Sequence, residues 1–225
     1  AKKGSYPDVI MKDIYRIPMS NYQFQIYEIL RRKERLSEKG KEKKNKKNKK
    51  KTVKSTFRVF SRQASNFVFP EEILRPYPDP KFVVSIKKNN ENEKENSKNF
   101  ERSLIEEEKL NDNGKISFDY KRRISVALNK LDDKGEIYLR PGPNGLDKLS
   151  PKMKLILENI EKCNGLIFIY SNFRSLEGIE ILSKVLDFNG YARYGSFGSE
   201  QKYAIYSGNK DEKIKKDILE TFTSE

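Results

Sequence analysis

The segment from Gly165 to Gly190, GLIFIYSNFRSLEGIEILSKVLDFNG, constrains the fold of this chain more than any other. Its apolar run 166–170 predicts a strand, and helical spacing follows at Leu176, Ile179, Leu182, Val185 and Leu186. Because the strand is apolar on both faces, we expect a parallel sheet with helices on both sides. The polar elbow 171–174 would then lie at the carboxyl end of the strand, where open α/β sheets collect ligands.

The sequence after this segment continues the alternation of strands and helices. Residues 191–194 and 202–206 predict strands separated by a glycine and serine loop, and residues 210–222 predict a helix. Gly190 is expected to cap the preceding helix in a left-handed conformation. The alternation predicts right-handed crossovers and a parallel sheet. Since the last helix ends near Phe222 with no strand after it, we expect a partial sheet and a chain cut from a larger protein.

Local capping signals predict helices upstream of the sheet. Ser20 is the expected N-cap of a helix over residues 21–37, and Asp119 that of a helix ending at Gly135. Ser150 followed by Pro151 predicts the start of another helix.

Other upstream segments carry weaker signals. We expect a short strand over residues 9–18 and a short helix over 56–66 that leads into a Pro-rich, extended exit. Residues 136–149 read as extended and turn-rich, before the helix that begins at Pro151. The rings of Phe57, Phe60 and Phe67 interleave with Arg58 and Arg62, as in nucleic-acid binders, but helix packing explains the rings equally well.

The net charge of +14 is concentrated in one lysine-rich tract. Residues 31–54 hold 14 Lys and Arg against three Glu, a net of +11. The part from Gly40 to Lys51 lacks apolar residues, which predicts a solvated insertion, with nonspecific attraction to phosphate as the functional alternative. A second low-complexity segment, 87–114, has balanced charge and is predicted to be a linker.

Composition excludes several classes of site. The chain has no histidine and one cysteine, Cys163, which excludes Ser-His-Asp catalysis, histidine metal sites and an internal disulfide. No apolar stretch is long enough to cross a bilayer, and the first residues lack a signal-peptide core. We therefore expect an intracellular protein with no membrane partner.

The run SPKMKLILENIEKCNGLIFIYSNFRSLEGIEILSKVLDFNGY, followed by YAIYSGNKDEKIKKDILETF, resembles the start of the second RecA-like lobe of superfamily 2 helicases. The resemblance is to the Snf2-like and poxvirus-type helicases of large DNA viruses, in which IFIYSNF corresponds to motif IV. The upstream IPMSNYQFQIYEILR is similar to the Snf2 junction between the lobes. For a viral source the location would be the virion or the host cytoplasm or nucleus.

The resemblance implies a fold class and a division of the chain. The fold is expected to be α/β, a partial RecA-like parallel sheet flanked by helices, with an N-terminal helical extension and two disordered insertions. The expected segments are an inter-lobe strand and helix (1–38), a basic insertion (39–54), a short helix with a Pro-rich stretch (55–86), a linker (87–114) and an incomplete C-terminal RecA-like domain (115–225).

The resemblance also implies a role and its partners. Polar residues after two strands would contact the phosphate backbone of DNA or RNA: Ser171, Asn172, Arg174, Ser207, Gly208 and Asn209. A GxxxxGK[ST] loop and a DExx motif are absent, so ATP and Mg²⁺ are expected in the parent protein and not on this fragment. The preceding RecA-like lobe would be its partner within the same polypeptide.

Two readings from different classes lead at this point, and a Rossmann-type nucleotide binder is a third. The first is a fragment of an ATP-dependent helicase or translocase that grips the nucleic-acid strand with the elbow. The second is a non-catalytic α/β module that binds nucleic acid or a protein through the lysine tract. An ordinary N-cap explains a Ser-Asn elbow after a strand without any ligand, and Tyr170 and Phe173 are either core residues or stacking platforms for bases.

Overall fold

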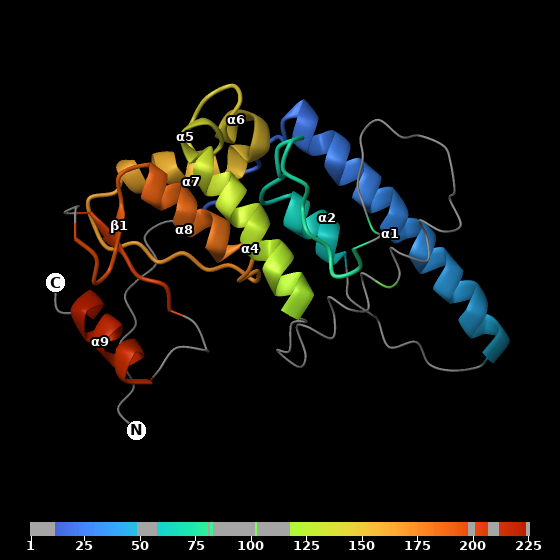
Figure 1. The fold of residues 1–225 in the computed structure, drawn as a ribbon. Coiled ribbons are helices and arrows are strands. Elements are labelled where there is room, and N and C mark those ends of the chain that lie inside the picture. Colours follow the sequence, from blue (N-terminus) through green and yellow to red (C-terminus); the bar gives the residue numbers. More distant parts are fainter. Residues whose placement is uncertain are drawn as a thin grey trace.

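Helices dominate the fold, and a small parallel sheet lies at one end of it (Figure 1). A computed structural model describes residues 12–48, 58–80, 82, 102, 118–197, 201–206 and 212–223, with side chains in the first range up to residue 36. The elements are α1 (Asn21–Asn48), α2 (Val59–Ala64), α4 (Phe118–Asp133), α5 (Gly135–Tyr138), α6 (Leu146–Leu149), α7 (Pro151–Glu161), α8 (Ile179–Phe188), β1 (Ala192–Arg193), β2 (Lys202–Tyr203) and α9 (Glu212–Thr223). The chain therefore has a mixed α/β fold.

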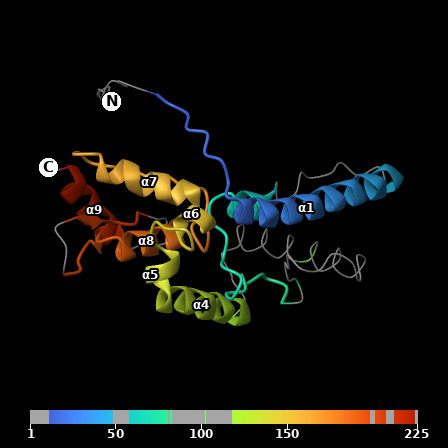
Figure 2. The same ribbon diagram turned by 90° about the horizontal axis from the view of Figure 1, so that it is seen from above.

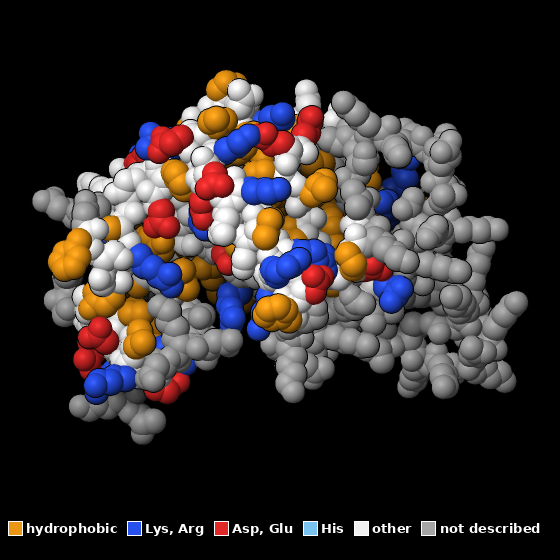
Figure 3. All heavy atoms as spheres, viewed as in Figure 1, with side chains coloured by type: hydrophobic (Ala, Val, Ile, Leu, Met, Phe, Trp, Pro, Cys, Tyr) orange, Lys and Arg blue, Asp and Glu red, His pale blue; other side chains and the backbone are white. Residues whose placement is uncertain are grey.

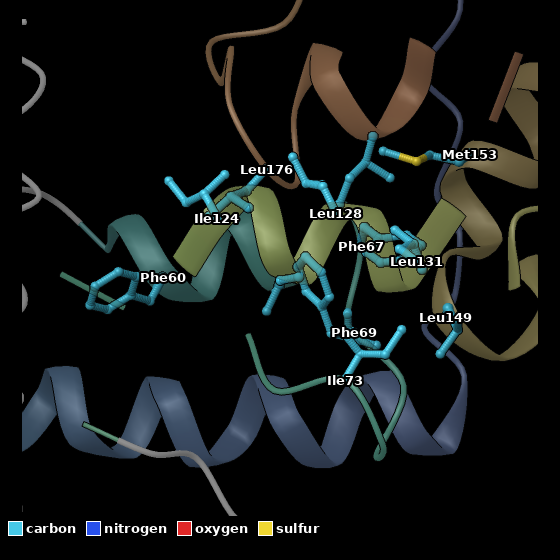
Figure 4. Close-up of a cluster of buried hydrophobic side chains, with 14 of the residues drawn as sticks. Phe60, Phe67, Phe69, Ile73, Ile124, Leu128, Leu131, Leu149, Met153 and Leu176 are labelled. Carbon is cyan, nitrogen blue, oxygen red and sulfur yellow. The ribbon is translucent and has the colours of Figure 1, made fainter. Parts of the chain in front are cut away.

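Helix α4 contributes one face to the hydrophobic core. Its buried face recurs at helical spacing and includes Tyr120, Ile124, Leu128 and Leu131. In Figure 4, Leu176 approaches α4 from the segment that precedes α8. Phe67 and Phe69 approach it from the segment that follows α2. Burial of each such side chain contributes about 1.5–3 kcal/mol. One cluster of buried residues runs from Leu30 to Val185, so α1, α2, α4, α6, α7 and α8 share a single core.

The predicted caps at Ser20, Ser150 and Gly190 are confirmed, whereas the predicted N-cap Asp119 is wrong, because α4 begins at Phe118 and Asp119 lies within it. The Ser20 hydroxyl accepts a hydrogen bond from the backbone N–H of Gln23 at 3.0 Å, and the Ser150 hydroxyl accepts one from Met153 at 3.1 Å. Each satisfies one of the N–H groups that a helix leaves unpaired in its first turn. Gly190 has a φ of +91°, the left-handed conformation expected after α8. Local sequence signals therefore determine where these helices begin or end.

Helix α1 extends beyond its predicted end. It continues through the lysine tract to Asn48, so the predicted solvated insertion is helical over residues 39–48. Lysine and glutamate are good helix formers, which allows the helix to propagate without apolar residues. The C-terminal half of α1 projects away from the other described elements (Figures 1 and 2). The rest of the insertion lies outside the described residues, as does the predicted linker apart from Arg102.

Two further predictions from sequence are wrong for the described residues. Residues 12–20 form no strand, since they are mostly exposed and pair with no other segment. The connection 136–149 is not fully extended, because α5 and α6 add two short helical turns to it. Helix α5 packs closely on α8: a Cβ at Gly135 would come within 2.1 Å of the Phe188 ring. Glycine at this position lets the Phe188 ring lie directly against the start of α5.

Figure 2 shows the helices from above, with α8 between α7 and α4. Strands β1 and β2 pair in parallel, with Ala192 opposite Lys202 and Arg193 opposite Tyr203. The predicted strands 191–194 and 202–206 are thus confirmed in direction, although the paired part of each is two residues long. No helix among the described residues is both long and apolar enough to span a membrane.

Strand β2 is tied to the end of α8 by Tyr203, whose hydroxyl donates to Asp187 Oδ1 at 2.8 Å. Burial, together with the hydrogen bond and charge of Asp187, raises the pKa of Tyr203 from 10.0 to about 12. A phenol with a higher pKa in the folded state stabilises the fold fully below pH 10, and this contribution disappears as the pH rises to about 12.

We therefore expect the free energy of unfolding, measured in urea, to fall between pH 10 and 12 more steeply for the wild type than for Tyr203→Phe. The substitution removes the titrating hydroxyl and leaves the ring, and it also leaves Tyr22, whose pKa burial raises in both proteins alike. Equal slopes for the two proteins would mean that Tyr203 ionises as freely in the folded chain as in the unfolded one.

Candidate nucleic-acid interface

The apolar segment 166–170 is extended but has no β partner among the described residues. Its side chains alternate between two environments. Phe168 and Tyr170 are 79% and 75% exposed, whereas Ile167 and Ile169 are half-buried and Ile169 packs against the core. The prediction of an interior strand covered on both faces is therefore wrong for the part of the chain described. The run is uniformly apolar, so its sequence could not reveal which face would stay uncovered.

The same alternation continues through the elbow. Asn172 and Arg174 are exposed, and Ser171 and Phe173 between them are half-buried. Leu166, Phe168 and Tyr170 thus form an outward apolar row on one side of the backbone. The chain bends at residue 172, where the exposed groups are the Asn172 amide and, two residues on, the Arg174 guanidinium.

The Ser171 hydroxyl makes its hydrogen bonds within the elbow itself. Its hydroxyl donates to the carbonyl of Phe173 at 3.0 Å and accepts from the N–H of the same residue at 3.2 Å. Such a hydroxyl closes a local turn. Of the hydroxyl and amide groups predicted to bind phosphate, this one is already engaged with the backbone.

The backbone N–H groups at the start of α8 also find hydrogen-bond acceptors in the elbow. The carbonyl of Phe173 accepts the N–H of Ile179 at 3.0 Å, and the carbonyl of Arg174 accepts that of Glu180 at 3.1 Å. The Glu180 carboxylate in turn accepts the N–H of Leu176, which has a φ of +48°. The positive end of the helix is therefore neutralised by groups of the chain, so binding at the elbow would rest on side chains.

Asn172 and Arg174 are the predicted site residues whose donors point outward. The Asn172 Oδ1 atom accepts a hydrogen bond from the Tyr170 hydroxyl at 2.9 Å, which leaves the amide N–H groups to donate elsewhere. Arg174 makes no ion pair within the described residues. An amide donor and a guanidinium are suited to phosphate oxygens. Ser207, Gly208 and Asn209 lie outside the described residues.

A buried ion pair holds the elbow against the segment that follows α2. The Arg75 guanidinium binds both carboxylate oxygens of Glu177, and the two side chains are 11% and 2% exposed. Arg75 also donates to Gln63 Oε1 at 2.8 Å and to the carbonyl of Pro76 at 2.9 Å, and it lies over the Tyr77 ring at 4.3 Å. The sequence gives no signal for this pair, because its members are 102 residues apart and have no characteristic spacing.

Elsewhere on the described surface, positively and negatively charged side chains lie next to one another. Figure 3 shows Lys and Arg side chains interspersed with Asp and Glu over the central elements. Several of these are surface ion pairs, such as Lys134 with Glu72 and Lys184 with Asp132. This agrees with the concentration of excess positive charge in residues 31–54 of the sequence.

No protein-family model matches the chain, and no solved structure gives a significant match. Two proteins of Acanthamoeba polyphaga mimivirus are significantly similar to the chain in sequence. The one named "Putative ATP-dependent RNA helicase R563" is 37% identical over 76 residues, which cover 33% of this chain and 13% of that protein.

The second, "Putative ATP-dependent RNA helicase R350", is 27% identical over an alignment of 264 positions that covers 97% of this chain and 31% of that protein. The chain thus spans less than a third of the length of either relative. Both relatives are viral and both carry a helicase name. The chain is therefore similar to two proteins named as putative RNA helicases, and nearly its whole length takes part in the alignment with the second.

Proposed function

We propose that this chain is part of an ATP-dependent helicase or translocase and contributes contacts to the backbone of a nucleic-acid strand through Asn172 and Arg174. The observation that carries the proposal is that both side chains are exposed. The backbone groups around them already have hydrogen-bond partners within the chain. The relationship to helicases across the chain supports it. RNA is the first nucleic acid to test, since the relatives are named as RNA helicases.

We further propose that residues 115–225 are the start of the second RecA-like lobe, of the Snf2-like or poxvirus-type kind. The order of motif-like segments supports this, as does the parallel direction of β1 and β2. The outward apolar row of Leu166, Phe168 and Tyr170 would then be covered by further elements of the complete protein. The preceding lobe of the same polypeptide would close on this one during the ATPase cycle.

The sequence lacks a phosphate-binding GxxxxGK[ST] loop, and the described residues contain no group of three Asp, Glu or Cys side chains placed to hold a metal ion. We therefore assign nucleotide binding and hydrolysis to other parts of the parent protein. The contribution of this chain is to bind and orient the strand.

Substitution of Arg174 by glutamine tests the proposal. Each phosphate contact to a single strand contributes about 0.7 to the slope of log affinity against log salt concentration, so we expect the slope to fall by about 0.7. The measurement is fluorescence anisotropy of a labelled oligouridine RNA titrated with the chain at several salt concentrations. Arg193→Gln is the matched control, because Arg193 is also exposed but lies in β1.

Deletion of residues 40–51 separates this proposal from the lysine-tract module. If the elbow carries binding, the deletion weakens affinity and the effect of Arg174→Gln persists in the shortened chain. Loss of all measurable binding on deletion, with no effect of Arg174→Gln in the intact chain, would favour the module and contradict the elbow.

A further inference from the structure

Helix α2 places a second arginine at the elbow. The guanidinium carbon of Arg62 lies 5.2 Å from the centroid of the Phe173 ring. Phe173 is half-buried and packs against the hydrophobic core, so its ring is a fixed platform. A cation over an aromatic ring within about 6 Å is held by roughly 0.5–1 kcal/mol at an exposed site. The contact therefore favours one position of an otherwise flexible, exposed side chain.

The positive charge of Arg62 is not neutralised nearby. Within the described residues Arg62 makes no ion pair, whereas Arg75 is bound to Glu177 and Arg123 is bound to Asp119. The two acidic residues closest in sequence to the elbow are also engaged: Glu177 by Arg75, and Glu180 by the backbone N–H of Leu176. A guanidinium that stacks on a ring retains the N–H donors along its edge, and these can bind a phosphate in a bidentate manner.

We propose that Arg62 and Arg174 together form a phosphate-binding site of the elbow, with Arg62 on the Phe173 ring and Arg174 next to Phe173 in the chain. The inference rests on the proposed function and adds to it a residue from an element more than 100 positions upstream of the elbow. The ligand is the phosphate backbone of a single-stranded nucleic acid. Two cations beside one elbow would contact phosphates close together on the same strand.

The Phe67 and Phe60 rings do not belong to this site. They are 0% and 1% exposed and form part of the core, which confirms the packing alternative for these rings. Arg62 is exposed on the same short helix. Of the interleaved rings and arginines of the sequence, Phe60 and Phe67 are therefore buried in the core, and Arg62 is exposed.

The test compares Arg62→Gln, Arg174→Gln and the double variant in the 225-residue chain, again by anisotropy with labelled oligouridine across a salt series. We expect each single substitution to lower the salt slope by about 0.7 and the double substitution by about 1.4. Arg62→Lys keeps the charge and should keep the slope, and Arg193→Gln should leave it unchanged. Thermal unfolding of each variant verifies that the fold is intact.

Three outcomes would contradict the Arg62 proposal, the proposed function, or both. An unchanged slope for Arg62→Gln, with a reduced slope for Arg174→Gln, would remove Arg62 from the site and leave the proposed function standing. Unchanged slopes for both would contradict the proposed function itself. If ATP at millimolar concentration displaced the RNA from the wild type but not from the double variant, the site would bind nucleotide phosphates and the strand assignment would be wrong.

Discussion

Replacement of Glu177 by alanine is expected to lower the free energy of unfolding by about 3–5 kcal/mol. The substitution leaves the Arg75 guanidinium, which is 11% exposed, without its carboxylate partner in the interior. Gln63 and the Pro76 carbonyl still bind Arg75, but neither carries a charge. Urea-induced unfolding followed by circular dichroism measures the loss.

A surface pair provides the matched control for this prediction. Glu72 binds Lys134, and their side chains are 46% and 47% exposed. Solvent screens such a pair, so Glu72→Ala should cost less than about 1 kcal/mol. The double variant Arg75→Met/Glu177→Leu removes both buried charges and should recover most of the stability lost in Glu177→Ala. Equal losses for Glu177→Ala and Glu72→Ala would show that the Arg75 pair is not buried in solution.

Replacement of Gly178 by alanine is expected to disturb both stability and binding. A Cβ at this position would lie 1.9 Å from the carbonyl oxygen of Phe173 and 2.3 Å from its carbonyl carbon, so the backbone of the elbow must move. Overpacking of this kind costs about 1–3 kcal/mol. The displaced elbow should also show a salt slope for RNA binding reduced by an amount similar to that in Arg174→Gln.

Gly165→Ala is the control for the glycine substitution. No atom lies within 4 Å of the position that a Cβ would occupy at Gly165, and its backbone is not left-handed. We expect this variant to match the wild type both in urea and in the anisotropy titration. If Gly178→Ala also matched the wild type in both measurements, the close approach of the elbow to the start of α8 would not exist in solution.

Helices were predictable from the sequence because their signals are local. Ser20, Ser150 and Gly190 mark helix ends through bonds or angles that involve only the next few residues. The apolar spacing of α4 likewise depends on one turn after another. The end of α1 was missed because lysine carries no stop signal, although its helix propensity permits the continuation to Asn48.

The sheet and the site were less predictable because they depend on distant partners. Residues 166–170 have the composition of a strand, but a strand also needs a neighbour to pair with, and the described residues supply none. The Arg62 contact with Phe173 and the Arg75 contact with Glu177 join segments more than 100 residues apart. The resemblance to motif IV pointed to Ser171, Asn172 and Arg174 as candidates, yet it could not show that the Ser171 hydroxyl and the N–H groups at the start of α8 already have partners within the chain.

The internal bonding of the elbow has a consequence for substitutions of Arg174. The main chain between Ser171 and Glu180 is held by its own carbonyls and by one carboxylate, and none of these bonds uses the side chain of Arg174. Replacement of the Arg174 side chain should therefore leave the path of this main chain unchanged, so any change in binding that follows can be assigned to the lost guanidinium and not to a rearranged backbone.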